Sequence, residues 1–225
     1  MKTIVYVDGY NLYFGCLKHS GDKWLDLQKL FAEHILSAQE PKSDSISIKF
    51  FTADIKAKVA SNGQKALLAQ QSYHRALIEL YGDTISIIKG YYTLEKGRLL
   101  AYKKPPEKSA RVDVWRLEEK QTDVNIALES YRDVAKGLAQ QLVFVSNDTD
   151  IAPALAAIRQ DYRAAVKIGV IIPVRKFSGG RPGNQQLSDY ADWTRKYITD
   201  EELAGSQLPA QIPTRRKPII KPDYW

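Results

Sequence analysis

Short apolar runs alternate with amphipathic segments along most of the chain, and this alternation constrains the fold more than any other feature. Residues 3–7, 46–52, 84–89, 142–146 and 166–172 are rich in β-branched and aromatic side chains and predict strands. Residues 24–36, 66–81, 122–136, 151–162 and 184–197 predict helices, most of them from apolar residues at helical spacing. Strands without clean polar alternation are typical of parallel sheets covered on both faces. We therefore predict an α/β fold, a Rossmann-like three-layer α/β/α sandwich with a mostly parallel central sheet.

Two segments depart from this alternation. Residues 91–120 mix aromatic and basic side chains, and we expect a basic insertion in which residues 91–94 and 98–102 pair around Lys96-Gly97. Residues 201–225 contain four prolines and the basic run Arg215-Arg216-Lys217, which favours an extended tail. The predicted organisation is one domain over residues 1–200, with its insertion at about 91–120, followed by a Pro-rich basic tail over 201–225.

Composition limits the classes of protein to which the chain can belong. Hydrophobic residues make up 44% of the 225 residues and charged residues 26%, which is an ordinary globular balance. Cys16 is the only cysteine, so neither an intramolecular disulfide nor a cysteine zinc cluster can form. No apolar run approaches the length of a membrane span. We expect a soluble, cytoplasmic protein with no membrane partner, and its net charge of +7 is compatible with a polyanionic partner.

Carboxylates stand where two predicted strands and one predicted helix meet their loops. Asp8 ends the first strand, Asp148 and Asp150 follow the strand over 142–146, and Asp123 opens the helix over 122–136. In an open α/β sheet the functional crevice lies at the carboxyl ends of the strands. Several carboxylates in one crevice repel one another unless a hard cation neutralises them. Asp8, Asp123 and Asp148 are therefore predicted ligands of Mg²⁺ or Mn²⁺, which would activate water for phosphodiester hydrolysis.

Two polar neighbours complete the predicted catalytic group. Asn11 could position water or phosphate, and Ser146 could hold the side chain of Asp148 or bind a phosphate. Asp150 is predicted to assist catalysis. Each carboxylate also has a structural alternative, because aspartate is common in turns and at helix N-termini.

The same residues resemble the NYN family, bacterial relatives of the PIN-domain nucleases. The resemblance rests on residues 7–12, 120–124 and 146–150 and extends in order and spacing over roughly residues 1–197. It implies a PIN-like fold and metal-dependent RNA cleavage, with catalytic or metal roles at Asp8, Asp123, Asp148 and Asp150. It places Asn11 and Ser146 at supporting positions. Gln121 and Asn147 depart from the pattern, since the family often has glycine there, and Glu129 stands where relatives often have aspartate.

Basic side chains are predicted to hold RNA beside the acidic crevice. Lys103 and Lys104 lie in the basic insertion, where aromatic neighbours could stack on bases. Arg181 lies in a glycine-containing loop that could approach a substrate. The predicted partner is single-stranded RNA, and self-association into a homo-oligomer stays open.

Three alternatives to a magnesium- or manganese-dependent ribonuclease remain. The first is another magnesium enzyme. A Toprim fold would need glutamate where this chain has Asp8, and a haloacid-dehalogenase phosphatase would need a second aspartate where it has Tyr10. A non-catalytic RNA-binding module of the same fold is the second. The third is a small-molecule enzyme such as a pyridine hydroxylase, since some members of the family are described as pyridine monooxygenases. The sequence carries no flavin or nicotinamide fingerprint.

Overall fold

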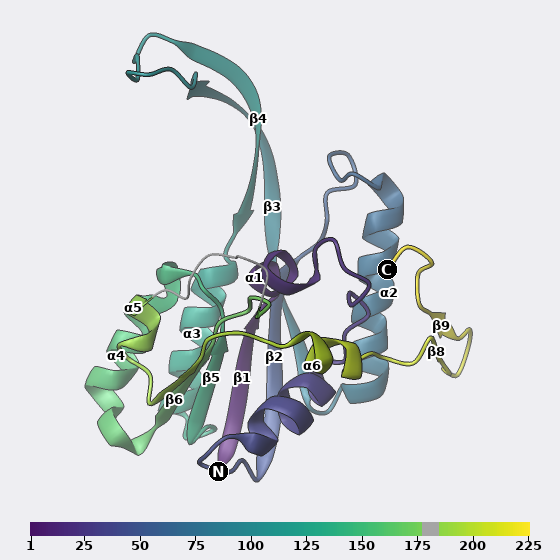
Figure 1. Cartoon of the computed structure of the whole chain (residues 1–225), viewed down its shortest axis with the longest axis vertical. Coiled ribbons are helices and arrows are strands. Elements are labelled where there is room, and N and C mark those ends of the chain that lie inside the picture. Colours follow the sequence, from purple (N-terminus) through teal and green to yellow (C-terminus); the bar gives the residue numbers. More distant parts are fainter. Residues whose placement is uncertain (177–184) are drawn as a thin grey trace.

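A seven-stranded sheet organises the computed structural model, which describes residues 1–176 and 185–225. Its order is β4-β3-β2-β1-β5-β6-β7 (Figure 1). All neighbouring strands are parallel except β3 and β4. The strands are β1 (Lys2–Asp8), β2 (Ser45–Ala53), β3 (Ile85–Leu100), β4 (Arg111–Lys120), β5 (Gln141–Val145), β6 (Lys167–Ile171) and β7 (Trp193–Arg195).

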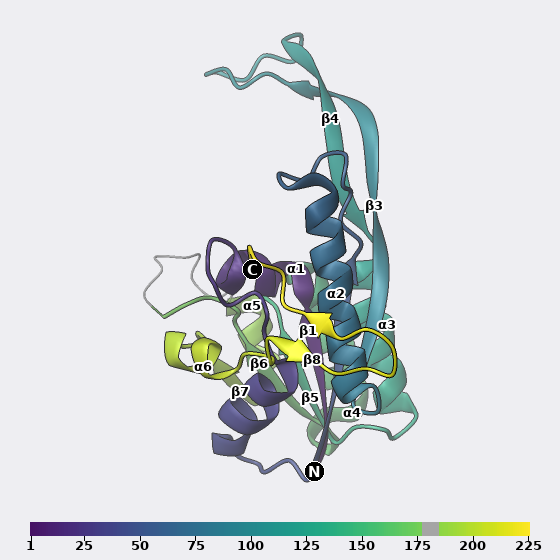
Figure 2. The ribbon, with the colours of Figure 1, turned by 90° about the vertical axis from the view of Figure 1, so that its right-hand side faces the viewer.

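Helices cover both faces of this sheet. One face carries the irregular helix η2 (Lys29–Ile35), the 3₁₀ turn η3 (Leu36–Ala38), α2 (Gly63–Tyr81) and α6 (Asp200–Gly205). The other face carries α3 (Thr122–Ala135), α4 (Ala152–Tyr162) and α5 (Gln185–Ser188), as Figures 1 and 2 show. The remaining short helices are α1 (Gly9–Leu12), η1 (Tyr13–Leu17), η4 (Thr149–Ile151) and η5 (Arg163–Ala165). The predicted α/β fold with a mostly parallel sheet is confirmed.

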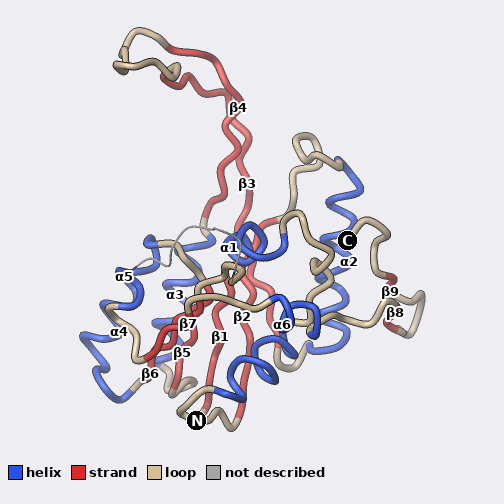
Figure 3. The backbone as a smooth tube through the Cα atoms, viewed as in Figure 1, coloured by secondary structure: helices blue, strands red, loops and turns tan. Residues whose placement is uncertain are grey.

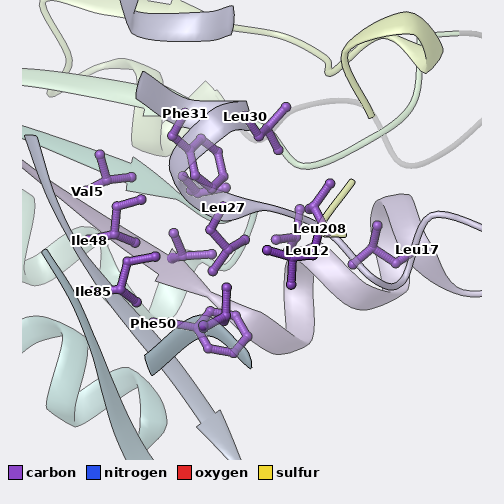
Figure 4. Packing of buried hydrophobic residues seen from close by; sticks show 14 of the residues in the cluster. Val5, Leu12, Leu17, Leu27, Leu30, Phe31, Ile48, Phe50, Ile85 and Leu208 are labelled. Atoms are coloured by element: carbon purple, nitrogen blue, oxygen red, sulfur yellow. The ribbon is translucent and has the colours of Figure 1, made fainter. Parts of the chain in front are cut away.

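The core has two halves because side chains of a strand alternate between the faces of its sheet. Val5 and Val7 of β1 pack with η2 and α2, whereas Ile4 and Tyr6 pack with α3 and α4. Figure 4 shows the first half, where Phe31 lies above Val5 and Ile48. Because β1 is buried on both faces, its sequence lacks polar alternation.

A long hairpin of β3 and β4 projects away from the body of the molecule (Figures 1 and 3). The predicted turn at Lys96-Gly97 is wrong, because Gly97 pairs with Val114 inside the ladder and the chain reverses between residues 100 and 111. Gly97 serves packing instead, since a methyl group at this position would lie 2.9 Å from Cδ of Arg116. The glycine signal was therefore misread as a turn signal.

The carboxyl-terminal segment, from residue 184 onward, also differs from its prediction. The expected helix over residues 184–197 lies partly outside the described residues, and α5 ends at Ser188. β7 then pairs with β6, and the indole of Trp193 occupies the space that Gly169 leaves open. Beyond α6, β8 (Gln211–Ile212) and β9 (Ile219–Ile220) pair, and Leu208, Ile212 and Ile219 are buried in the first half of the core.

The strand order identifies where the fold can hold a ligand. Without the hairpin strand β4, the order β3-β2-β1-β5-β6-β7 corresponds to the 3-2-1-4-5-6 order of doubly wound folds. The order reverses between β1 and β5, and ligands of such folds bind outside the carboxyl ends of the strands at this point. Within the described part of the chain, no helix is both long and apolar enough to cross a lipid bilayer.

Candidate active site

Asp8 and Ser146 end the two strands that flank the reversal point. The Ser146 hydroxyl donates to Oδ2 of Asp8 at 2.9 Å and accepts from the backbone N–H of Asp148 at 3.0 Å. Both residues are buried. This one hydroxyl therefore joins the loop after β1 to the loop after β5 and fixes their relative position.

Asn11 supports the same junction. Its backbone N–H donates to Oδ1 of Asp8 at 2.9 Å, and its side-chain amide donates to Oδ2 at 2.6 Å. Its own carbonyl oxygen accepts from the N–H of Asn147 at 3.2 Å. Asp8 is only 2% exposed, and burial raises the pKa of its carboxyl group to about 6 although these hydrogen bonds lower it. Gly9 allows the close packing here, since a methyl group would lie 2.6 Å from the Phe51 carbonyl oxygen.

A cavity of about 920 Å³ opens at this edge of the sheet. Its walls come from α1 and η1, the end of β2 and the loop that follows, α2, the base of the β3–β4 hairpin, the start of α3, and the carboxyl-terminal segment. The volume lies in the range of small-molecule sites. The fold thus places a ligand-sized cavity beside its reversal point.

One end of the cavity is acidic. Asp8, Glu119, Asp123 and Asp148 line it. Burial and the neighbouring carboxylates, Asp8 first among them, raise the pKa of the half-buried Asp123 to about 6. Glu119 accepts hydrogen bonds from the hydroxyls of Tyr92, at 3.3 Å, and Thr122, at 2.5 Å. Since no described side chain donates a hydrogen bond to the carboxylate of Asp123, its oxygens remain available to a ligand.

Aromatic rings form much of the remaining wall. The ring of Tyr73 lies edge-on to Phe50, at 6.3 Å between centroids, and 5.6 Å from Trp225. The rings of Tyr10 and Phe14, which also line the cavity, lie 4.3 Å apart between centroids. These rings offer faces on which a planar ligand can stack.

His74 adds a neutral polar group to this wall. Burial lowers its pKa to about 4, so the imidazole is uncharged at neutral pH. Its Nδ1 atom is buried and has no hydrogen-bond partner among the described residues.

The predicted site residues divide into two groups. Asp8, Asn11, Asp123 and Asp148 line the cavity, and Ser146 lies buried beside them. Asp150 is exposed and contributes to a separate hollow of about 680 Å³ together with Asp123. The structure thus brings four of the predicted residues to one cavity, and their catalytic roles stay predictions.

The predicted RNA-binding residues lie elsewhere. Lys103 and Lys104 are exposed in the connection at the far end of the β3–β4 hairpin, away from the cavity (Figure 1). Arg181 falls outside the described residues.

The predicted Mg²⁺ or Mn²⁺ site at Asp8, Asp123 and Asp148 is wrong. Among residues 1–176 and 185–225, no three Asp, Glu, His or Cys side chains are arranged to hold a metal ion. Both Asp8 oxygens accept hydrogen bonds from Asn11 or Ser146, and Oδ1 of Asp148 accepts from the N–H of Asp150 at 3.0 Å. Asp8 and Asp148 cap short helices, which was the structural alternative, whereas Asp123 lies in the first turn of α3 without a capping hydrogen bond.

Several cavity residues had no clear signal in the sequence. Glu119 and Tyr92 reach the acidic end because the hairpin pairs them across two strands. His74 and Trp225 reach the wall through helix α2 and the carboxyl-terminal segment. Only the aromatic residues that follow Asp8, such as Tyr10 and Phe14, could have been suspected, since they stand directly after a strand end.

Comparisons with families and solved structures add little on function. No family model matches the chain. A solved structure of a protein of unknown function from Vibrio parahaemolyticus is similar over 92% of this chain and 95% of its own, with 22% identity and a TM-score of 0.49. Similarity at this level carries no conclusion about activity.

A curated relative overturns the predicted activity. 6-Hydroxy-3-succinoylpyridine 3-monooxygenase HspA of Pseudomonas putida is 42% identical over 242 aligned positions, which cover all of this chain and 75% of the relative. The predictions of a ribonuclease, of a hydrolase and of Mg²⁺ or Mn²⁺ as cofactor are therefore wrong, because the relative is an oxygenase of a small molecule. The small-molecule alternative is favoured instead. The chain belongs to the family of 6-hydroxy-3-succinoylpyridine 3-monooxygenase HspA.

Proposed function

We propose that the protein is a monooxygenase that hydroxylates a small, planar, hydroxylated pyridine in the cavity beside the reversal point of the sheet. The observation that carries the proposal is the 42% identity to the named monooxygenase along the whole chain. The size of the cavity and its aromatic walls support a small planar ligand. Neither feature favours a polymeric substrate.

Asp123 is the proposed general base. A pKa near 6 leaves its carboxylate ionised and weakly basic at neutral pH, which suits proton transfer from a ring hydroxyl. Loss of that proton raises the electron density of the ring and so favours attack on oxygen. Asp8 is less suited to this role, because both of its oxygens already accept hydrogen bonds.

A monooxygenase places one atom of O₂ in its substrate and reduces the other to water with two electrons from a reductant.

The first turn after β1 does not fit a dinucleotide held in the Rossmann manner. Asp8 occupies the N-terminus of α1 and accepts the N–H of Asn11, so its negative charge would repel a phosphate there. We assign no step of the reaction to a nucleotide at that turn.

A turnover assay tests the proposal. The purified protein receives 6-hydroxy-3-succinoylpyridine in air with NADH alone or with reduced flavin mononucleotide, and consumption of O₂ and substrate is measured. We expect consumption of O₂ that depends on this substrate. 3-Succinoylpyridine serves as the control, because it lacks the hydroxyl that Asp123 would deprotonate, and should be oxidised at least tenfold more slowly. Absence of substrate consumption with either reductant would contradict the proposal.

Two earlier predictions stay predictions. The resemblance of residues 7–12, 120–124 and 146–150 to the NYN family supports a PIN-like variant of the doubly wound fold. RNA binding by Lys103, Lys104 and Arg181 has support only from charge and from that resemblance.

A further inference from the structure

Lysines gather on the cavity wall apart from its acidic end. Lys18 and Lys23 follow η1, and Lys56 lies in the loop after β2. These three residues, called the cavity lysines below, form no ion pair with any residue that the structure describes. Ion pairs are common elsewhere, including Lys49 with Asp133 and Lys89 with Asp54. The cavity lysines are thus cations without a protein counter-charge, in a cavity that holds four carboxylates.

The four carboxylates of the acidic end are likewise without a paired cation. Among the described ion pairs, none includes Asp8, Glu119, Asp123 or Asp148. The charges that raise the pKa of Asp123 are all carboxylates, and no lysine lowers it. No described ion pair therefore joins the two sets of charge.

Aromatic rings line the same cavity. Phe50, beside the end of β1, contacts Tyr73, which contacts Trp225. Trp225 in turn lies 6.3 Å from Trp24, the neighbour of Lys23 in sequence. The lining of this one cavity therefore offers a ligand carboxylates, aromatic rings and lysines.

A second path of rings leads from the carboxylates to Lys18. The hydroxyl of Tyr92 donates to Glu119, and Tyr10 is close enough to raise the pKa of Tyr92. Tyr10 packs against Phe14, and the ammonium group of Lys18 lies 4.7 Å from the centre of the Phe14 ring. These contacts link a carboxylate, aromatic rings and Lys18 within the cavity lining.

We propose that the cavity lysines bind the carboxylate of an acidic side chain on the substrate and so orient its ring hydroxyl toward Asp123. This inference rests on the proposed function, because the succinoyl group in the relative's substrate ends in a carboxylate two methylene groups beyond its ketone. The substrate class is a planar N-heteroaromatic ring with a hydroxyl at one end and an aliphatic acid at the other. Such a molecule complements both charged ends of the cavity in one orientation only.

A cofactor phosphate is the other anion that these lysines could bind. The substrate carboxylate is favoured because the same cavity lining combines the lysines with aromatic rings and carboxylates, which matches a single hydroxylated ring bearing a short acidic chain. The two sources predict different ligands for the same lysines, and a titration can separate them.

Calorimetric titration of anaerobic protein without reductant tests the inference. The ligands are 6-hydroxy-3-succinoylpyridine, its uncharged methyl ester, and flavin mononucleotide. We expect the wild type to bind the acid about tenfold more tightly than the ester, since a hydrogen bond between charged groups is stronger than one to a neutral group. The double variant Lys23→Met with Lys56→Met should lose most of the preference for the acid, because Lys18 alone remains, and should bind the ester with unchanged affinity.

Lys58→Met is the matched control. Lys58 is exposed in the same loop as Lys56 and does not line the cavity. Its substitution removes the same kind of charge as the substitution of Lys56. It should keep the preference for the acid. Circular dichroism and thermal melting check that all variants fold.

The outcomes separate the two proposals. A double variant that keeps the preference for the acid, or loses affinity for acid and ester alike, would overturn the inference. So would lysine-dependent binding of flavin mononucleotide with the acid preference intact, which would assign the lysines to a phosphate. A lysine-dependent acid preference in a protein that never oxidises the ring would support the inference and contradict the proposed function. Binding of neither pyridine would overturn both.

Discussion

The two ends of the cavity are built from different kinds of structure. The acidic end stands on strand ends and helix starts, where Ser146 and Asn11 hold Asp8 through hydrogen bonds. The lysine end stands on loops, and Lys18 and Lys56 are exposed there. Hydrogen bonds between elements of the sheet fix the position of the first end, whereas exposed loops carry the second. In the proposed function the acidic end serves the reaction and the lysine end serves selection of the substrate.

Loss of the proposed base should have the largest effect. Asp123→Asn keeps the size of the side chain and removes its basicity, so kcat should fall by roughly 10²- to 10⁴-fold with little change in KM. The lysine double variant should do the reverse, raising KM with kcat nearly unchanged. Steady-state kinetics of both variants check this contrast. Asp83→Asn, a substitution at an exposed residue outside the cavity, is the control. An equal fall of kcat in Asp123→Asn and in the lysine double variant would contradict the distinction between the two ends.

Stability should also distinguish the two ends. Ser146→Ala leaves a buried Asp8 oxygen and the Asp148 N–H without their shared partner, which should lower the free energy of unfolding by about 2–3 kcal/mol. Lys56→Met should change it by less than about 0.5 kcal/mol, as expected for an exposed loop residue. Urea denaturation measures both. A harmless Ser146→Ala would mean that the hydrogen bonds at the acidic end do not fix its geometry.

Repulsion at the acidic end should appear in the pH dependence of stability. The folded-state pKa of Asp123, about 6, lies above its ordinary value of 3.8, so the folded protein binds more protons between these values and loses stability as the pH rises through them. Asp123→Asn should not show this loss, because asparagine does not titrate in this pH range. Its advantage over the wild type should grow from near zero at pH 4 to about 1 kcal/mol above pH 6, after allowance for solvent screening. Denaturation at both pH values checks this, and a constant difference would show that Asp123 is not perturbed.

The smallest effect concerns the backbone beside the acidic end. Gln121 precedes α3 with a φ of 74°, in the left-handed region that glycine adopts without strain. Gln121→Gly should therefore raise the free energy of unfolding by about 1 kcal/mol. Thermal melting measures the change, and Lys58→Gly is a comparison at an exposed loop residue with no positive φ. A destabilised Gln121→Gly would indicate that the side chain makes a contact that outweighs the strain.

The sequence predicted the sheet better than the site. Strands such as β1 and β5 are continuous apolar runs that only burial on both faces explains, and the carboxylates at their ends do reach one cavity. The hairpin was misread because a packing glycine looks like a turn glycine. Glu119 and Trp225 could not be predicted as cavity residues, because their positions depend on pairing and packing between distant segments.

The predicted metal site was wrong for a different physical reason. The same Asp8 and Asp148 that suggested a metal site are hydrogen-bonded within their own loops, and spacing along the chain cannot separate a cap from a ligand. The cavity lysines were not predicted as a group, because Lys18, Lys23 and Lys56 meet only in the folded chain.

Incorporation of labelled oxygen tests the central claim most directly. The protein is incubated with 6-hydroxy-3-succinoylpyridine and reductant under ¹⁸O₂ in ordinary water, and the mass of the product is measured by mass spectrometry. The proposed monooxygenase reaction predicts one ¹⁸O atom in each product molecule, with the label absent when ¹⁸O is supplied only as water. Product that takes its new oxygen from water, or substrate that remains unchanged under ¹⁸O₂, would contradict it.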